Sequence, residues 1–293
     1  MAAKIMHSRW RATRDSLRET GDRFAEMVSS SRDPRAKVTA DWSVADTAAH
    51  VATIASLYAS ILRPDELPHP FPALEGHILA ATVDTVAPLN DMVLRDFTER
   101  DPQVLGRRLR ADIDRILRAG EHLDPATPVT WLGGARVPTA GVLAHLINEL
   151  MIHGWDIARA TGAHWTMPPQ DAALFFDMFL IGVLRHDIGR LLDTGEPARE
   201  RRIAVEFRSG YTVPVTLVLR DGRVSVEEPG GGTDVRLSFD PATLNLMLFG
   251  RVGKVRAALT GKVRVAGPRP WLLPAFLRAV RLPSNSYPLS RPD

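Results

Sequence analysis

Two side chains that can bind a metal ion, Glu149 and His153, lie within the otherwise apolar segment HLINELMIHGWDIARATG. They are four residues apart, so a helix would place both on one face, among Leu146, Leu150 and Ile157. Burying an ionised carboxylate without a partner costs several kcal/mol, and such groups are therefore paired or bound to a metal. A hydrogen bond between the two side chains and a shared cation would each meet this cost.

A third side chain of this kind is His50, which shares a helical stripe with Ile54, Leu57 and Ile61. The stripe predicts that His50 also faces the interior of a helical bundle. Two histidines and one carboxylate leave a coordination position open on zinc, nickel or ferrous iron, which is the composition of a catalytic site. The spacing alone does not show that His50 meets the other two side chains.

Two sequence pieces, DWSVADTAAHVA and ELMIHGWDIARATG, resemble the mycothiol-dependent maleylpyruvate isomerase family in their order and separation. The N-terminal domain of that family is a DinB-like four-helix bundle. The resemblance implies that His50, Glu149 and His153 bind a divalent metal, usually zinc. It covers most of residues 8–190, and the two pieces are its specific part.

The C-terminal part carries a second, less detailed resemblance. LSFDPATLNLMLFGR followed by GKVRVAG is similar to that family's second domain, which resembles sterol carrier proteins. We therefore expect two domains, an all-α DinB-like four-helix bundle over residues 1–197 and a small α+β domain resembling sterol carrier proteins over residues 198–293. The apolar period changes from helical to alternating near residue 200, which agrees with this boundary.

The elements that must position the three side chains follow from periodicity, caps and proline positions. Predicted helices cover residues 10–27, 43–62, 74–122 with interruptions near Pro88 and Pro102, a segment that ends at Gly162, and 169–192. Ser43 and Asp46 form a predicted capping box for the second of these helices. Predicted strands, with Asp221-Gly222 as a hairpin turn, cover residues 203–207, 213–219, 233–239 and 262–267, and helices follow at 241–249 and 270–280.

The family resemblance implies a borrowed thiol. A metal would bind the sulfur of mycothiol and lower its pKa, so that a thiolate forms near neutral pH. The thiolate would add to a conjugated double bond in an isomerisation, or displace a leaving group in a transfer reaction. The chain has no cysteine, which agrees with a borrowed nucleophile. The expected partners are a low-molecular-weight thiol and a small electrophilic substrate.

Two other functions stay open on the sequence. A non-catalytic binding protein could keep the bundle and its metal, and use the sterol-carrier-like domain to hold an apolar ligand. A metal-dependent hydrolase could activate water instead and would need no thiol.

Five further side chains could act near the metal, but each has a structural alternative. For His145 we favour a place on the helix surface or behind the ligands over that of a fourth ligand. Asp156 could orient a ligand or pair with a neighbouring arginine, and Trp155 is expected to pack in the bundle or to form a pocket wall. Arg251 and Lys254 could bind an anionic substrate or the polar part of the thiol, or form a solvated basic turn.

Composition limits the other classes of function. The longest apolar run, at residues 172–184, contains Asp177 and is shorter than the roughly 20 residues that span a bilayer. The N-terminus lacks the pattern of a signal peptide, so we expect a cytoplasmic protein with no membrane partner. The net charge is only +3, with arginines scattered among acidic residues, and no nucleic-acid partner is expected.

Overall fold

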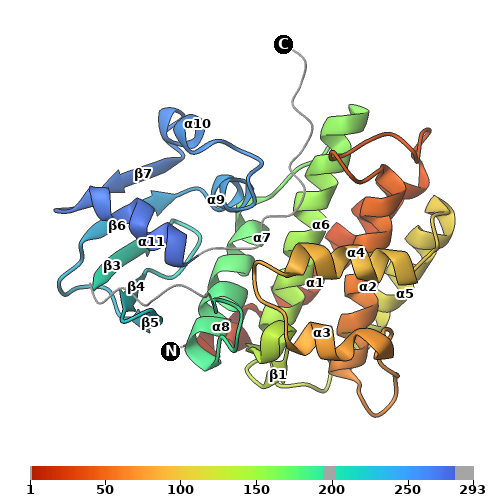
Figure 1. Cartoon of the computed structure of the whole chain (residues 1–293), viewed down its shortest axis with the longest axis horizontal. Helices are drawn as coiled ribbons and strands as arrows, with labels where there is room; N and C mark the ends of the chain where they lie inside the picture. Colours follow the sequence, from red (N-terminus) through yellow and green to blue (C-terminus); the bar gives the residue numbers. More distant parts are fainter. Residues whose placement is uncertain (1, 194–201, 281–293) are drawn as a thin grey trace.

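The computed structural model describes residues 2–193 and 202–280. Helices make up the first of these ranges, and a five-stranded sheet with short helices makes up the second. Figure 1 shows the sheet beside the helical part, with α7 and α8 between the two. The proposed domain boundary between residues 197 and 198 lies outside the described residues.

Four long helices form the bundle. They are α1 (Ala2–Ser29), α2 (Val44–Leu62), α5 (Pro102–Ala119) and α6 (Thr139–Thr161). Helices α5 and α6 each pack against both α1 and α2, which brings α2 alongside α6 (Figure 1). Fully buried side chains such as Leu17, Phe24, Leu109 and Leu146 fill the space between them. Packing of these apolar stripes supplies most of the stability of such helices.

The ends of α2 and α6 are set by local signals. Ser43 Oγ accepts a hydrogen bond from the backbone N–H of Asp46 at 3.2 Å, and Asp46 Oδ2 accepts one from the backbone N–H of Ser43 at 3.0 Å. This capping box satisfies two N–H groups that the helix leaves without partners, and it confirms the predicted start of α2. Helix α6 ends at Gly162, which has a φ of 75°, a conformation that glycine adopts at little cost.

Residues 74–122 form three helices, and the interruption predicted near Pro88 lies a few residues before this proline. Helices α3 (Glu75–Leu79) and α4 (Val86–Asp96) precede α5, and the break falls at residues 80–85. Pro88 fits within the first turn of α4, where its missing N–H would have no partner in the helix. The second predicted break is confirmed, because Asp101 Oδ1 caps α5 by accepting from the N–H groups of Gln103 and Val104.

The helix predicted over residues 169–192 is shorter and less regular than expected. It consists of α7 (Pro169–Leu174), a π-helical segment η3 (Phe175–Leu180) and α8 (Ile181–His186). It ends early because Asp187 is extended and its carbonyl accepts a hydrogen bond from the N–H of Arg136 at 2.8 Å. Arg136 belongs to the small hairpin of β1 (Pro128–Thr130) and β2 (Arg136–Pro138). Contact with this hairpin replaces the helical turns that were predicted after His186.

The sheet has the strand order β5-β4-β3-β6-β7, and only the β3–β6 pair among these neighbours is parallel. Its strands are β3 (Ile203–Arg208), β4 (Val215–Arg220), β5 (Arg223–Glu227), β6 (Val235–Phe239) and β7 (Val263–Ala266). Asp221 and Gly222 have positive φ values of 50° and 73° and form the predicted turn between β4 and β5. The alternating pattern therefore predicted the sheet correctly.

Three helices accompany the sheet: α9 (Pro241–Leu248), α10 (Lys254–Leu259) and α11 (Leu273–Ala279). Helix α10 was not predicted. The side chain of Phe176, from η3 of the helical part, packs against Phe207 and Phe239 of the sheet, with ring centroids 5.4 and 5.2 Å away. The two parts thus share an apolar contact next to the bundle.

Candidate metal centre

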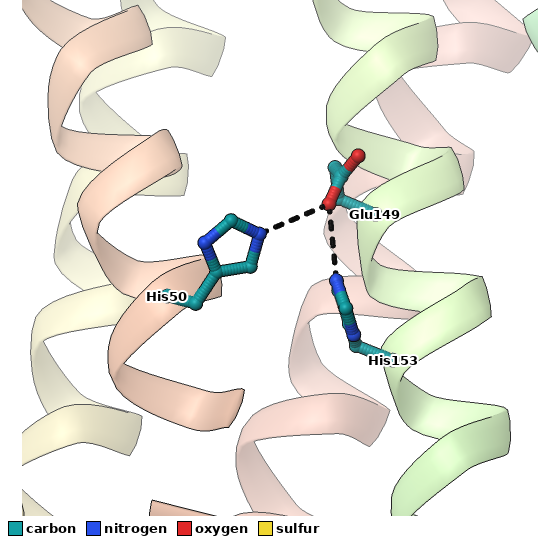
Figure 2. Close-up of side chains that lie close together, drawn as sticks. All are labelled: His50, Glu149 and His153. Carbon is teal, nitrogen blue, oxygen red and sulfur yellow. Dashed lines mark ion pairs between the residues drawn. The ribbon is translucent and has the colours of Figure 1, made fainter. Parts of the chain in front are cut away.

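The three side chains expected to bind a metal lie together between α2 and α6 (Figure 2). Nε2 of His50 is 3.5 Å from Oε2 of Glu149, and Nε2 of His153 is 3.3 Å from the same oxygen. The three candidate ligand atoms all lie within 4.8 Å of one another. Only 4 % of each imidazole and 12 % of the Glu149 side chain is exposed to solvent. The fold therefore brings together residues from two helices that are far apart along the chain.

This arrangement fits a divalent cation. Two imidazole nitrogens and a carboxylate oxygen are ligands that zinc accepts, with a further position left open. Nε2 of His50 is buried and has no hydrogen-bond partner among the described residues. Leaving a buried polar atom without a partner costs free energy, and a cation bound at this point would remove that cost.

The protonation states of Glu149 and His50 suit metal ligands, whereas for His153 burial lowers the pKa but the contacts with Asp156 and Glu149 outweigh it and raise this pKa. Burial raises the pKa of Glu149, but the facing imidazole nitrogens of His153 and His50 outweigh it and hold this pKa well below its usual value. Burial lowers the pKa of His50, despite the opposing effect of Glu149. Glu149 is therefore ionised and His50 neutral near pH 7, which are the forms that bind a metal.

His153 is held from behind by a pair that joins the two parts of the molecule. Its Nδ1 lies 3.4 Å from Oδ2 of Asp156. Arg251, in the turn after α9, donates from Nε to Oδ1 of Asp156 at 3.1 Å and from Nη2 to Oδ2 at 2.7 Å. These two side chains are almost completely buried, with 0 % of Asp156 and 3 % of Arg251 exposed. Asp156 thus lies beside a candidate ligand and pairs with Arg251, while Lys254 is exposed.

His145 lies beside Glu149 but contacts the carboxylate oxygen that His50 and His153 do not face. The indole N–H of Trp131 donates to the Tyr58 hydroxyl at 2.8 Å, and this hydroxyl lies 2.9 Å from Nδ1 of His145. Because the indole N–H can only donate, the Tyr58 hydroxyl accepts from Trp131 and donates its own proton to Nδ1 of His145. This places the His145 proton on Nε2, which is 3.6 Å from Oε1 of Glu149.

Tyr58 and Trp131 were not identified from the sequence. Tyr58 lies two turns after His50 on the same face of α2, and that spacing is a signal that could have indicated it. Trp131 follows β1 in a connecting segment, where no periodicity points to its position. Trp155 is half-buried, with the Arg159 guanidinium 5.6 Å from the centre of its ring, and it is not among the described residues of the cavity next to the site.

A cavity of about 150 Å³ lies next to the three side chains, and His50 and Glu149 form part of its wall. Most of the wall consists of apolar side chains from α2, α4, η3 and α8, including Ile54, Val93 and Phe179. A reactive group held by the metal residues would therefore be next to a largely apolar space in which water has few polar partners.

Residues 10–158 match the family model described as the mycothiol maleylpyruvate isomerase N-terminal domain. The chain belongs to this family. Residues 193–270 match the model of the SCP-2 sterol transfer family. These matches confirm both the recognition and the fold class expected from the sequence, a DinB-like helical domain followed by a sterol-carrier-like domain.

Two solved structures are similar to this member of the family. A crystal structure of a histidine-to-alanine mutant of the mycothiol-dependent maleylpyruvate isomerase is 13% identical with a TM-score of 0.50, and the alignment covers 87% of this chain and 92% of that one. A crystal structure of the mycothiol-dependent maleylpyruvate isomerase is 15% identical with a TM-score of 0.49 and the same coverage. The first likeness shows that the fold extends over both domains.

A comparison with proteins of curated function finds no match. Within residues 2–193 and 202–280, none of the helices combines the length and the apolar character needed to cross a membrane.

Proposed function

We propose that this protein is a metal-dependent enzyme that uses mycothiol to isomerise a small electrophile or to transfer the thiol to it. The proposal rests on one observation above all, the convergence of Nε2 of His50 and Nε2 of His153 on Oε2 of Glu149 beside a largely apolar cavity. Membership of the family supports mycothiol as the thiol, and the similar solved structures are of a mycothiol-dependent maleylpyruvate isomerase.

His50, Glu149 and His153 would hold the metal, for which we propose zinc. A bound divalent ion supplies a positive charge that lowers the pKa of a thiol to near neutrality. Asp156 fixes the ring of His153 through Nδ1, and His145 faces the second oxygen of Glu149. Both contacts orient the ligands, as carboxylates and imidazoles behind a metal site commonly do.

The cavity walls would hold the electrophile and exclude water. In an isomerisation the sulfur forms a bond to one carbon of a conjugated double bond, the remaining single bond rotates, and the sulfur leaves with its electron pair. In a transfer reaction the carbon–sulfur bond persists and a leaving group departs with the electrons. Neither route requires a nucleophile from the chain, which has no cysteine.

Turnover of a small electrophile should depend on both the metal and mycothiol. We expect removal of the metal, or His50→Ala, to lower the rate by about 100-fold or more, since several kcal/mol of stabilisation would be lost. The exposed His122→Ala variant serves as the matched control and should keep full activity. Equal turnover in thiol-free buffer would contradict the proposal and favour metal-dependent hydrolysis.

The alternative of a non-catalytic binding protein remains testable because the cavity is largely apolar. Of residues 202–280, only Phe249 and Val280 line it, so the ligand would be held mainly by the bundle rather than by the sterol-carrier-like domain. Mass spectrometry of ligands retained on purification, combined with absence of turnover at saturating mycothiol, would favour this alternative.

A further inference from the structure

The described wall of the cavity beside His50 and Glu149 contains no lysine and no arginine. Aliphatic and aromatic side chains form most of it, including Ile54, Leu57, Leu89, Val93, Phe175 and Phe179. The one acidic side chain of this wall is Glu149. A ligand with several negative charges would therefore find no cationic side chain along the described wall away from the metal residues.

The nearest cation on the second domain is already engaged. Arg251 donates from Nε and Nη2 to the two oxygens of Asp156, and from Nη1 to the backbone carbonyl of Phe249 at 2.6 Å. Its side chain is 3 % exposed, and Arg251 does not belong to the described wall. Using this guanidinium to bind a substrate would require breaking a buried ion pair, which costs several kcal/mol.

Away from the metal residues, the two hydroxyl groups of the wall are likewise paired. The Tyr58 hydroxyl contacts Trp131 and His145, and the Thr53 hydroxyl donates to the backbone carbonyl of His50 at 2.7 Å. A carboxylate entering this space would lose its water and gain little in return, because burying an unpaired charge is strongly unfavourable. An apolar group would instead gain from leaving water, at about 25 cal/mol per Å² of buried surface.

The size of the cavity limits the ligand further. A largely apolar, partly open cavity of about 150 Å³ is of the size that holds one benzene molecule. We propose that the electrophile accepted by this site is a compact, uncharged, apolar molecule of about the size of a substituted benzene ring, and that dicarboxylates are poor substrates. This inference rests on the proposed function and names the class of substrate for the same site.

Two unreactive probes that share a nitrobenzene ring test the inference by binding alone. In 4-nitrotoluene and 4-nitrobenzoate a methyl group and a carboxylate occupy the same position on the ring. Equilibrium dialysis against zinc-loaded protein without thiol, followed by absorbance, gives both dissociation constants. We expect 4-nitrotoluene to bind at least about tenfold more tightly, a difference of about 1.4 kcal/mol. Direct binding of the 4-nitrobenzoate carboxylate to zinc would tighten the binding of that probe. The comparison therefore includes an effect that opposes the expected result.

A cation placed in the wall should change this preference. Val93, on α4, is half-buried and lines the cavity. Val93→Lys should therefore shift the ratio of the two dissociation constants by about tenfold in favour of 4-nitrobenzoate. Leu57→Lys, at another half-buried wall position, replaces it if the first variant does not fold. Leu79→Lys is the matched control, because Leu79 is 44% exposed and lies outside the described wall.

Equal or tighter binding of 4-nitrobenzoate to the unaltered protein would overturn the inference. A ratio that Val93→Lys and Leu57→Lys leave unchanged would also overturn it, since the wall would then not determine the preference. Failure of the proposed function is recognised separately. Preference for 4-nitrotoluene without any mycothiol-dependent turnover supports the ligand class and contradicts the enzyme, whereas turnover of dicarboxylates with mycothiol contradicts only the ligand class.

Discussion

At the scale of single residues, the account depends on two imidazoles and a carboxylate that face one point. His50 and His153 each direct Nε2 at the same oxygen of Glu149. Purified protein should contain about one zinc ion per chain, and a His50→Ala, His153→Ala double variant should contain almost none, because a single carboxylate holds zinc weakly. Elemental analysis measures this, with His122→Ala as the control. Equal metal content in all three proteins would contradict the site.

The Asp156 carboxylate gives a second prediction at this scale. Asp156→Asn keeps the shape of the side chain but weakens its contacts with Nδ1 of His153 and with Arg251. We expect the affinity for zinc to fall by about 10- to 100-fold, as for other side chains that orient metal ligands. Competition with a chelator measures the affinity. The exposed Asp114→Asn variant should match the unaltered protein, and an unchanged affinity in Asp156→Asn would argue against the positioning role.

Glu149 and His153 could be assigned to one site from the sequence, because residues four positions apart on a helix lie on the same face. His50 could be added only through the family resemblance, since spacing along the chain says nothing about contacts between distant helices. The pairing of Asp156 with Arg251 could not be predicted for the same reason, and it depends on how the second domain docks against α6. The proton on Nε2 of His145 follows from the Trp131 and Tyr58 contacts, which only the fold supplies.

At the scale of elements, α6 carries two of the three candidate ligands and lies against η3. Gly141 of α6 allows this contact, because a Cβ there would lie 2.7 Å from the backbone oxygen of Met178. We expect Gly141→Ala to lower the free energy of unfolding by about 1–3 kcal/mol, despite alanine's higher helix propensity. Urea titration measures this change.

Gly76, on α3, is the matched control for that substitution. A Cβ at Gly76 would meet no atom within 4 Å. Gly76→Ala should therefore raise the free energy of unfolding by about 0.5–1 kcal/mol, the difference in helix propensity. If both substitutions changed stability in the same direction and by the same amount, close packing of α6 on η3 would not be the cause.

Local signals predicted the elements where one signal dominates. The capping box of Ser43 and the glycine at position 162 set the ends of α2 and α6 as expected. The π-helical segment and the early end at His186 depend instead on contacts with β2 and α6, which periodicity does not encode. Helix α10 is short and partly exposed, so its apolar pattern is too weak to predict.

At the scale of the whole molecule, buried polar contacts join the two domains. Asn245 of α9 donates to the side-chain oxygen of Asn148 at 3.1 Å and to the carbonyl of Ala172 at 3.0 Å, and Arg251 binds Asp156 nearby. Between the same two domains, the backbone N–H of Val213 donates to Oδ1 of Asp177 at 3.3 Å. The family resemblance predicted both domains, but the residues that join them could not be inferred without the structure.

Asp177 should make stability depend on pH. Burial raises the pKa of Asp177 from 3.8 to about 6, although the charge of Arg9 opposes this. Because the folded pKa lies above the unfolded one, the folded state binds the proton more tightly, and this stabilisation is present below pH 4 and lost as the pH rises to about 6. Relative to Asp177→Asn, the free energy of unfolding should fall by about 3 kcal/mol between pH 4 and pH 7. Parallel pH profiles for the two proteins would contradict the buried carboxylate, and Asp114→Asn is the control.

The central claim is that His50, Glu149 and His153 hold a metal with a position open to a thiol. Cobalt in place of zinc tests it directly, because a thiolate bound to cobalt produces a charge-transfer absorption that a nitrogen and oxygen site lacks. Titration of the cobalt protein with mycothiol should produce this band and saturate at about one thiol per chain, with one coordination position left by the three side chains. A cobalt spectrum that saturating mycothiol leaves unchanged would contradict the claim.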